Sequence, residues 1–255
     1  NYDYMIENSY RPTSAYVFEG EYSFSLEHLK QEYPSYGTSD FRMPAVEILQ
    51  KNGSRITNFT YVSSKVYAGK PKLASLPATY TEKDEEADTL EILLRDELLN
   101  VELTLYYTIF NEENAIARSA RFENKGGEEM QLTTAMSLSL DLPDADYAWM
   151  QFSGYWSRER HLKERTLQPG ITSINSTRGD SGHVHNPVVV LKRPSADEFQ
   201  GEALGFSLVY SGNFLAQAEV DSFGVTRMMM GINPFGFSWC LKGGESFQTP
   251  EAVVV

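Results

Sequence analysis

The sequence has a shortage of positive charge, which limits the partners that the protein can have. It holds 22 lysine and arginine residues against 35 aspartate and glutamate residues, a formal net charge of −13. Such a balance opposes binding to nucleic acid or to an anionic membrane surface, so neither is expected as a partner. The sequence also lacks an uninterrupted apolar run of about 18 residues, which excludes a typical membrane-spanning helix.

Cysteine is nearly absent as well. Cys240 is the one cysteine of the chain and cannot form an intrachain disulfide. Its apolar neighbours in GFSWCLKGG predict a buried thiol in a strand rather than a nucleophile, because apolar surroundings raise the pKa of a thiol. One cysteine and no signal-peptide pattern favour a cytoplasmic location.

Motifs that would indicate catalysis are also missing. There is no Gly-x-Ser-x-Gly elbow and no glycine-rich phosphate loop. His183 and His185 would share one face of a strand and could bind a metal, but no further ligand lies nearby, so a hydrogen-bonded loop is the preferred interpretation. The acidic run over residues 81–88 is interpreted as a solvated loop. We therefore assign no catalytic residue, no metal and no cofactor to this chain.

Alternation of apolar and polar residues is abundant. Residues 130–142 place Met130, Met136 and Leu138 on one predicted face, with Ser137 and Asp141 on the other. Residues 101–110 and 115–124 alternate in the same way around a four-residue connection, which predicts an antiparallel hairpin. Further strands are predicted over residues 45–49, 58–67, 89–96, 187–193, 204–212, 214–221, 226–232 and 235–241.

This density of strands predicts an all-β protein with few or no helices. More than a dozen strands in one open sheet would leave too much apolar surface in water, so two large antiparallel sheets packed face to face are expected. The 255 residues show no linker-like stretch and no repeat of propeller length, so residues 1–255 are predicted to form one domain.

Two clusters combine aromatic rings with charged side chains, as carbohydrate sites do. YGTSDFRMPA contains Asp40, Phe41 and Arg42, and FSGYWSRERH contains Tyr155 and Trp156 beside two arginines. A ring can lie against the apolar face of a sugar while ionised groups bind its hydroxyls. From chemistry alone, salt-bridged strand ends packed by aromatic rings are the simpler interpretation of both clusters.

Seven motifs occur in an order that resembles the N-terminal β-supersandwich of the family 36 glycoside hydrolases, the α-galactosidases. They are IARSARFENKG, SLSLDLPDADY, SGYWSRERH, RGDSGHVHNP, GFSLVYSGNF, GINPFGFSW and GESFQTPEAV, and the likeness extends from about residue 36 to the last residue. The resemblance implies a galactose-mutarotase-like supersandwich. It also implies that this chain is a fragment of a longer enzyme, whose (β/α)8 barrel with both catalytic aspartates is absent here.

The resemblance further implies the activity of the parent enzyme and a role for this part of it. Such enzymes remove terminal α-1,6-linked galactose from melibiose- and raffinose-type oligosaccharides with retention, and form homo-oligomers, commonly tetramers. Their N-terminal domain packs on its own barrel and lends a loop to the active site of a neighbouring subunit. By motif position this loop is residues 36–42, with Asp40 and Arg42 expected to hydrogen-bond sugar hydroxyls and Phe41 to stack. The fragment alone is expected to be inactive.

Two rival functions remain. A stand-alone carbohydrate-binding module would bind sugar without the missing barrel, and a mutarotase-like enzyme would need a catalytic histidine and glutamate in the sandwich. The ending FQTPEAVVV is interpreted as a strand cut partway. We expect a strand over residues 252–255 at a sheet edge or pointing outward, leading into a missing domain.

Overall fold

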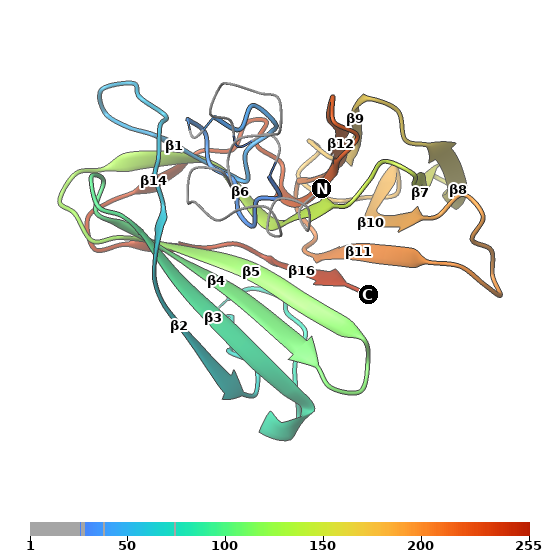
Figure 1. Ribbon diagram of the computed structural model, residues 1–255, viewed down its shortest axis with the longest axis horizontal. Coiled ribbons are helices and arrows are strands. Elements are labelled where there is room, and N and C mark those ends of the chain that lie inside the picture. The colour runs from blue at the N-terminus through green and yellow to red at the C-terminus, as the bar shows by residue number, and fades with distance from the viewer. Residues whose placement is uncertain (1–25, 27–28, 38, 74) are drawn as a thin grey trace, which may run out of the picture.

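The computed structural model describes residues 26, 29–37, 39–73 and 75–255, and these fold into two antiparallel β-sheets (Figure 1). The smaller sheet has six strands in the order β1, β6, β13, β12, β9, with β14 paired to β6. The bounds of these strands are β1 Val46–Leu49, β6 Met130–Leu142, β9 Gly170–Asn175, β12 Phe214–Val220, β13 Thr226–Ile232 and β14 Trp239–Leu241.

The larger sheet has ten strands in the order β2, β3, β4, β5, β16, β11, β10, β7, β8, with β15 paired to β5. Their bounds are β2 Thr60–Ala68, β3 Ala87–Asp96, β4 Val101–Phe110, β5 Ala115–Asn124, β7 Ala148–Tyr155, β8 Arg158–Thr166, β10 His185–Lys192, β11 Ala203–Val209, β15 Ser246–Gln248 and β16 Glu251–Val254.

The expected all-β, two-sheet architecture is confirmed. Among the described residues the one helical element is a single 3-10 turn, η2 (Asp84–Glu86), and none of them forms a helix that could cross a bilayer. The hairpin predicted over residues 101–124 is β4 and β5, joined by a four-residue turn, with continuous pairing from Val101–Asn124 to Phe110–Ala115.

Two apolar clusters hold the sheets together. In the first, Trp149 and Phe206 of the larger sheet pack against Phe214 and Met228 of the smaller one. The second cluster contains β1 and one end of β6 on one side and β4 and β5 on the other, with Phe122 fully buried. Each large side chain removed from water in this way stabilises the fold by about 1.5–3 kcal/mol.

The long strand β6 departs from simple alternation at two irregularities. Its register shifts against β1 near Ile48 and against β13 near Gly231. Because a bulge inserts one residue, it reverses which face the following side chains occupy. Met136 therefore packs with Ala45 and Met229 and not in the Leu138 cluster. The prediction that Met136 and Leu138 share a face is wrong for this reason.

The last strand is not where the sequence placed it. β16 ends at Val254 and lies between β5 and β11, inside the ten-stranded sheet (Figure 1). The expected edge position is therefore wrong, because both neighbours supply hydrogen-bonded ladders. Cys240 on β14 is also only half-buried, while the adjacent Leu241 is fully buried, so the predicted core thiol is wrong as well.

The bulge of β6 depends on the absence of a side chain at Gly231 on β13. A Cβ added there would lie 2.8 Å from Met136 Cα and 2.8 Å from Ser137 N. Gly231→Ala should therefore lower the free energy of unfolding by about 1–3 kcal/mol in urea titrations. Gly127→Ala is the control, since a Cβ there meets nothing within 4 Å. Equal stability of the two variants would contradict this role of Gly231.

Candidate functional site

The loop of residues 36–42, which the sequence predicts to contact sugar, precedes β1 and is bonded to the smaller sheet; Thr38 lies outside the described residues. The backbone N–H of Met43, next after the loop, donates to Glu219 Oε2 of β12 at 2.8 Å. Inside the loop, Gly37 and Ser39 have φ values of 96° and 66°, the left-handed region. At Gly37 a side chain would also meet Ile56, with contacts from 2.8 Å. Glycine is therefore required there on two counts.

Beneath the loop lies a buried ion cluster centred on Arg227 of β13. Arg227 is paired with Asp141 on the neighbouring strand β6, and its Nε donates to Asp141 Oδ1 at 2.7 Å. Its Nη2 donates to Asp40 Oδ2, also at 2.7 Å. Asp40 thereby attaches the loop to two strands of the smaller sheet through one guanidinium group.

Arg42 completes the cluster from within the loop. Its Nε donates to Asp40 Oδ1 at 2.9 Å, and its Nη2 donates to the Leu29 carbonyl at 2.8 Å. Its Nη1 lies 3.5 Å from Asp141 Oδ2 and 3.4 Å from Asp221 Oδ2 in the β12–β13 turn. Three carboxylates and two guanidinium groups therefore join the loop, the preceding segment and two strands.

The charges in this cluster decide the protonation of its members. Burial disfavours the ionised form of Asp40, but hydrogen bonds and positive charge from Arg42 and Arg227 outweigh it, so the pKa of Asp40 lies below its usual value. Burial by itself lowers the pKa of Arg227. The hydrogen bonds and charge interactions with Asp141 and Asp40 outweigh burial, so the pKa of Arg227 is raised. For Asp40 and Arg227 the direction of each pKa shift thus favours the ionised form, because each has partners of opposite charge, as buried charges require.

The structure separates the three predicted site residues. Asp40 and Arg42 are each 5% exposed, whereas Phe41 between them is 79% exposed. Asp40 accepts four hydrogen bonds, three from Arg42 and one from Arg227, which occupies the acceptor sites of a carboxylate. The loop therefore exposes the ring of Phe41 to solvent, while the charged groups of Asp40 and Arg42 on either side of it are already hydrogen-bonded within the protein.

The second predicted cluster forms the tip of the β7–β8 hairpin. Tyr155 and Trp156 are 60% and 75% exposed, and the ring of Tyr155 packs edge-on against His183 at 5.9 Å between centroids. Ser157 and Arg160 both have positive φ, and β8 bulges opposite Gly154. Among the described residues, no hydrogen bond or ion pair joins this cluster to the Asp40 ion cluster.

His185 lies in a chain of hydrogen bonds with Ser153 and Gln151. Ser153 Oγ is 2.9 Å from His185 Nδ1 and accepts from Gln151 Nε2 at 2.7 Å. Burial, and then the charge of Arg165, lower the pKa of His185. Within the described residues no group of three or more histidine, cysteine or acidic side chains is arranged to hold a metal, and His28 lies outside them.

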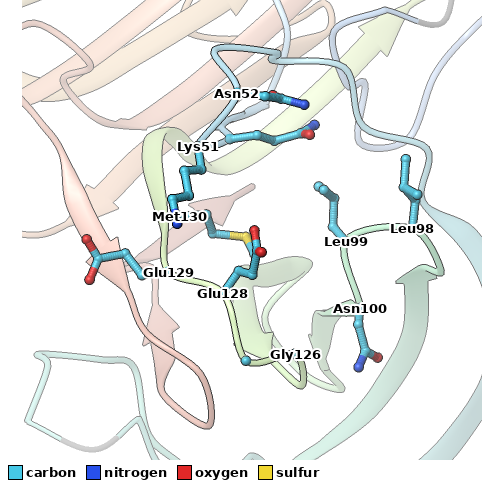
Figure 2. Close-up of a pocket in the computed structure, with 11 residues that line it drawn as sticks. Lys51, Asn52, Leu98, Leu99, Asn100, Gly126, Glu128, Glu129 and Met130 are labelled. Carbon is cyan, nitrogen blue, oxygen red and sulfur yellow. The ribbon is translucent and has the colours of Figure 1, made fainter.

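A cavity of about 460 Å³ opens at the far end of the second apolar cluster (Figure 2). Lys51 and Asn52 follow β1, Leu98 and Leu99 come from the β3–β4 turn, and Glu128 comes from the β5–β6 connection. None of the predicted site residues lines this cavity, so it is a feature that sequence reasoning did not find.

Arg227 and its partner Asp141 were likewise not assigned to a site from sequence. The available signal is Arg227 itself, the one charged residue in the apolar strand TRMMMGI. A charge in a buried strand requires a partner, and an acidic residue on the polar side of another strand can supply it.

The chain is similar in sequence to known proteins. The family model of the glycosyl hydrolase family 36 N-terminal domain matches residues 4–242. The chain is 54% identical over 233 residues to α-galactosidase AgaA of Geobacillus stearothermophilus, covering 91% of this chain and 32% of that protein. The chain belongs to glycosyl hydrolase family 36. Its resemblance to that family, seen first in seven separated motifs, is confirmed.

Other members of family 36 agree. Probable α-galactosidase G of Aspergillus terreus is 42% identical over 230 residues, which is 90% of this chain and 31% of that protein. The crystal structure of AgaA superposes with a TM-score of 0.90 at 55% identity, covering 91% of this chain and 32% of that one. This family 36 N-terminal domain therefore spans about a third of the length of the relatives it matches.

Arg227 should dominate the stability of the ion cluster. Arg227→Met keeps much of the side-chain volume but leaves Asp40 and Asp141 buried without their partner, so we expect the free energy of unfolding to fall by about 3–5 kcal/mol. Arg55→Met removes the surface pair with Glu47, where the arginine side chain is 45% exposed, and should cost about 0–1 kcal/mol. A loss below about 1 kcal/mol for Arg227→Met in urea titrations would contradict this assignment.

The lowered pKa of Asp40 predicts how the stability varies with pH. Because its folded pKa lies below the usual 3.8, ionised Asp40 stabilises the fold at higher pH, and this contribution is lost as the pH falls through the folded pKa. The difference in free energy of unfolding between the parent chain and Asp40→Asn should be largest above about pH 5 and shrink toward pH 2. Glu198→Gln, at an exposed carboxylate, is the control. A difference for Asp40→Asn that stays constant with pH would refute the prediction.

Proposed function

We propose that this chain is the N-terminal domain, residues 1–255, of an α-galactosidase that hydrolyses terminal α-1,6-linked galactose from melibiose- and raffinose-type oligosaccharides. Two findings support the proposal: membership of family 36 and the length of the α-galactosidases that the chain matches. Structures of AgaA variants from G. stearothermophilus hold raffinose and stachyose. The catalytic carboxylates belong to a barrel outside this sequence.

The observation that carries the domain's own role is the ion cluster under the 36–42 loop. Asp40 and Arg42 use their polar atoms to fix the backbone, and Phe41 stands 79% exposed between them. A fixed, exposed ring suits stacking on the apolar face of a sugar, because little conformational freedom is lost on binding. In the proposed enzyme this loop completes the pocket of a neighbouring subunit, with Phe41 contacting substrate and Asp40 and Arg42 positioning it.

Three further parts belong to the same proposal. The domain packs on its own catalytic barrel, the enzyme is a homo-oligomer, and it works in the cytoplasm. The free thiol of Cys240 and exposed apolar side chains of the sandwich, among them Trp156 and Phe199, support these parts.

The proposal predicts that the isolated domain and the longer enzyme differ in hydrolytic activity. The 255-residue chain alone should release no galactose from raffinose, and the longer protein should release it. In the longer protein Phe41→Ala should raise KM for raffinose about tenfold, equivalent to ~1.4 kcal/mol of lost binding, with a small change in kcat. Initial rates against raffinose and stachyose measure both effects.

Phe235→Ala is the matched control, because this phenylalanine is 77% exposed on a different loop. Unchanged kinetics in Phe41→Ala would remove the ring from the site while leaving the hydrolase proposal standing. Sugar binding by the isolated chain, together with an inactive longer protein, would instead favour a carbohydrate-binding module.

A further inference from the structure

The strand β8 gives this acidic chain a basic edge. β8 is the last strand of the ten-stranded sheet, and all nine of its residues are exposed. It carries Arg158, Arg160, Lys163 and Arg165 against two glutamates. No carboxylate of the described residues lies within ion-pair distance of any of the four, so none of the described carboxylates pairs with this positive charge.

The hairpin that ends in β8 also exposes the residue types that anchor protein interfaces. Tyr155, Trp156 and Leu162 are 60%, 75% and 52% exposed. Tryptophan, tyrosine and arginine are enriched among interface residues whose truncation costs most binding energy. The hairpin tip is closely packed, since a Cβ at Gly154 would lie 2.3 Å from the carbonyl oxygen of Arg158. Because the bulge there disrupts strand pairing, a partner is expected to bind through side chains.

A group of carboxylates lies where β3 begins and where β4 turns into β5, in the same sheet as β8. Glu82, Asp84, Glu85 and Asp88 come from η2 and its flanks, and Glu112 and Glu113 form the β4–β5 turn. The two segments are joined, because Asn111 donates from its backbone N–H to the Glu86 carbonyl at 3.0 Å and from Nδ2 to the Glu85 carbonyl at 2.9 Å. All six of these carboxylate side chains are exposed.

We define these two surfaces as the basic edge (β8 and the 154–157 tip) and the acidic end (η2 with its flanks and the β4–β5 turn). Figure 1 shows them far apart, with β8 at the upper right and the ends of β3 and β4 at the bottom. Ile109 and Ile116, which pair beside the β4–β5 turn, are 50% and 37% exposed. Each surface therefore combines one sign of charge with exposed apolar side chains.

We propose that the basic edge of one copy of this chain docks on the acidic end of a second copy. The proposal deepens the homo-oligomer part of the proposed function by naming the surfaces. Charge complementarity selects the second copy as the partner, since a chain with a net charge of −13 itself supplies the acidic surface that the basic edge fits. The contact joins two different patches, so it can close as a ring, form twice in a two-fold pair, or extend as an open chain of copies.

The test uses sedimentation velocity on the 255-residue chain and two charge-reversed variants. Arg158→Glu with Lys163→Glu reverses the basic edge, and Glu112→Lys with Glu113→Lys reverses the acidic end. Each variant should raise the dissociation constant of self-association at least about tenfold, because like charges then face each other. An equimolar mixture of the two variants should associate again, since each then supplies the surface that the other lacks.

Salt and a control variant complete the design. Raising NaCl from about 0.05 M to 0.5 M should weaken association of the parent chain, as screening requires. Lys51→Glu with Lys242→Glu changes the net charge as the basic-edge variant does, but at other exposed positions, and should leave association unchanged. A monomeric parent chain at every concentration would overturn the proposal. Association that persists in both reversed variants, or a mixture that stays monomeric, would overturn the named surfaces and leave the hydrolase proposal intact.

Discussion

The guanidinium group of Arg227 is fully buried, and the outer face of the smaller sheet is organised by the need to neutralise it. Asp141 of β6 and Asp40 of the 36–42 loop both bond to it, so one charge joins two strands and a loop. A buried cation without partners would be strongly destabilising, whereas a cation with two carboxylates and oriented hydrogen bonds is tolerated. The loop is thus part of the sheet's electrostatics, because moving it away would remove Asp40, one of the two carboxylates that pair with Arg227.

This constraint also explains why the loop displays Phe41. The backbone turns at this point, because the N–H of Arg42 donates to Asp40 Oδ1 at 3.1 Å. Asp40 and Arg42 both direct their charged groups into the ion cluster, and Phe41 between them is 79% exposed. The exposed ring is therefore held by the bonds that its two neighbours make. Additional bonds from Met43 to Glu219 and from Arg42 to Leu29 fix the segments on either side. The ring therefore stands on a support that is bonded in several directions.

Much of the fold was predictable from period-two alternation, because most strands have one face on the core and one toward solvent. The hairpin of β4 and β5 was found with its turn, since Val101, Leu103 and Leu105 alternate with polar residues and are buried. The alternation failed at β6, where bulges reverse the faces around Met136, and a bulge leaves no mark in composition. It also failed at β8, which carries charges on both faces because neither packs on a core. The identity of Phe41 as the exposed residue could not be predicted, because it depends on Arg227, nearly 190 positions later in the chain.

The two ends of the larger sheet illustrate a different use of charge from that in the buried cluster. Edge strands expose unpaired backbone groups, and charged side chains and bulges on them oppose indiscriminate strand pairing. On β8 both devices are present, the bulge opposite Gly154 and the run of arginine and lysine. Yet charges of mixed sign would serve that purpose equally well, whereas this edge is predominantly basic in a chain with a large excess of acidic residues. Protection against aggregation explains the presence of charge on β8 but not its sign. Binding to an acidic surface explains both the presence and the positive sign of the charge on β8. The residues that such binding needs are already exposed.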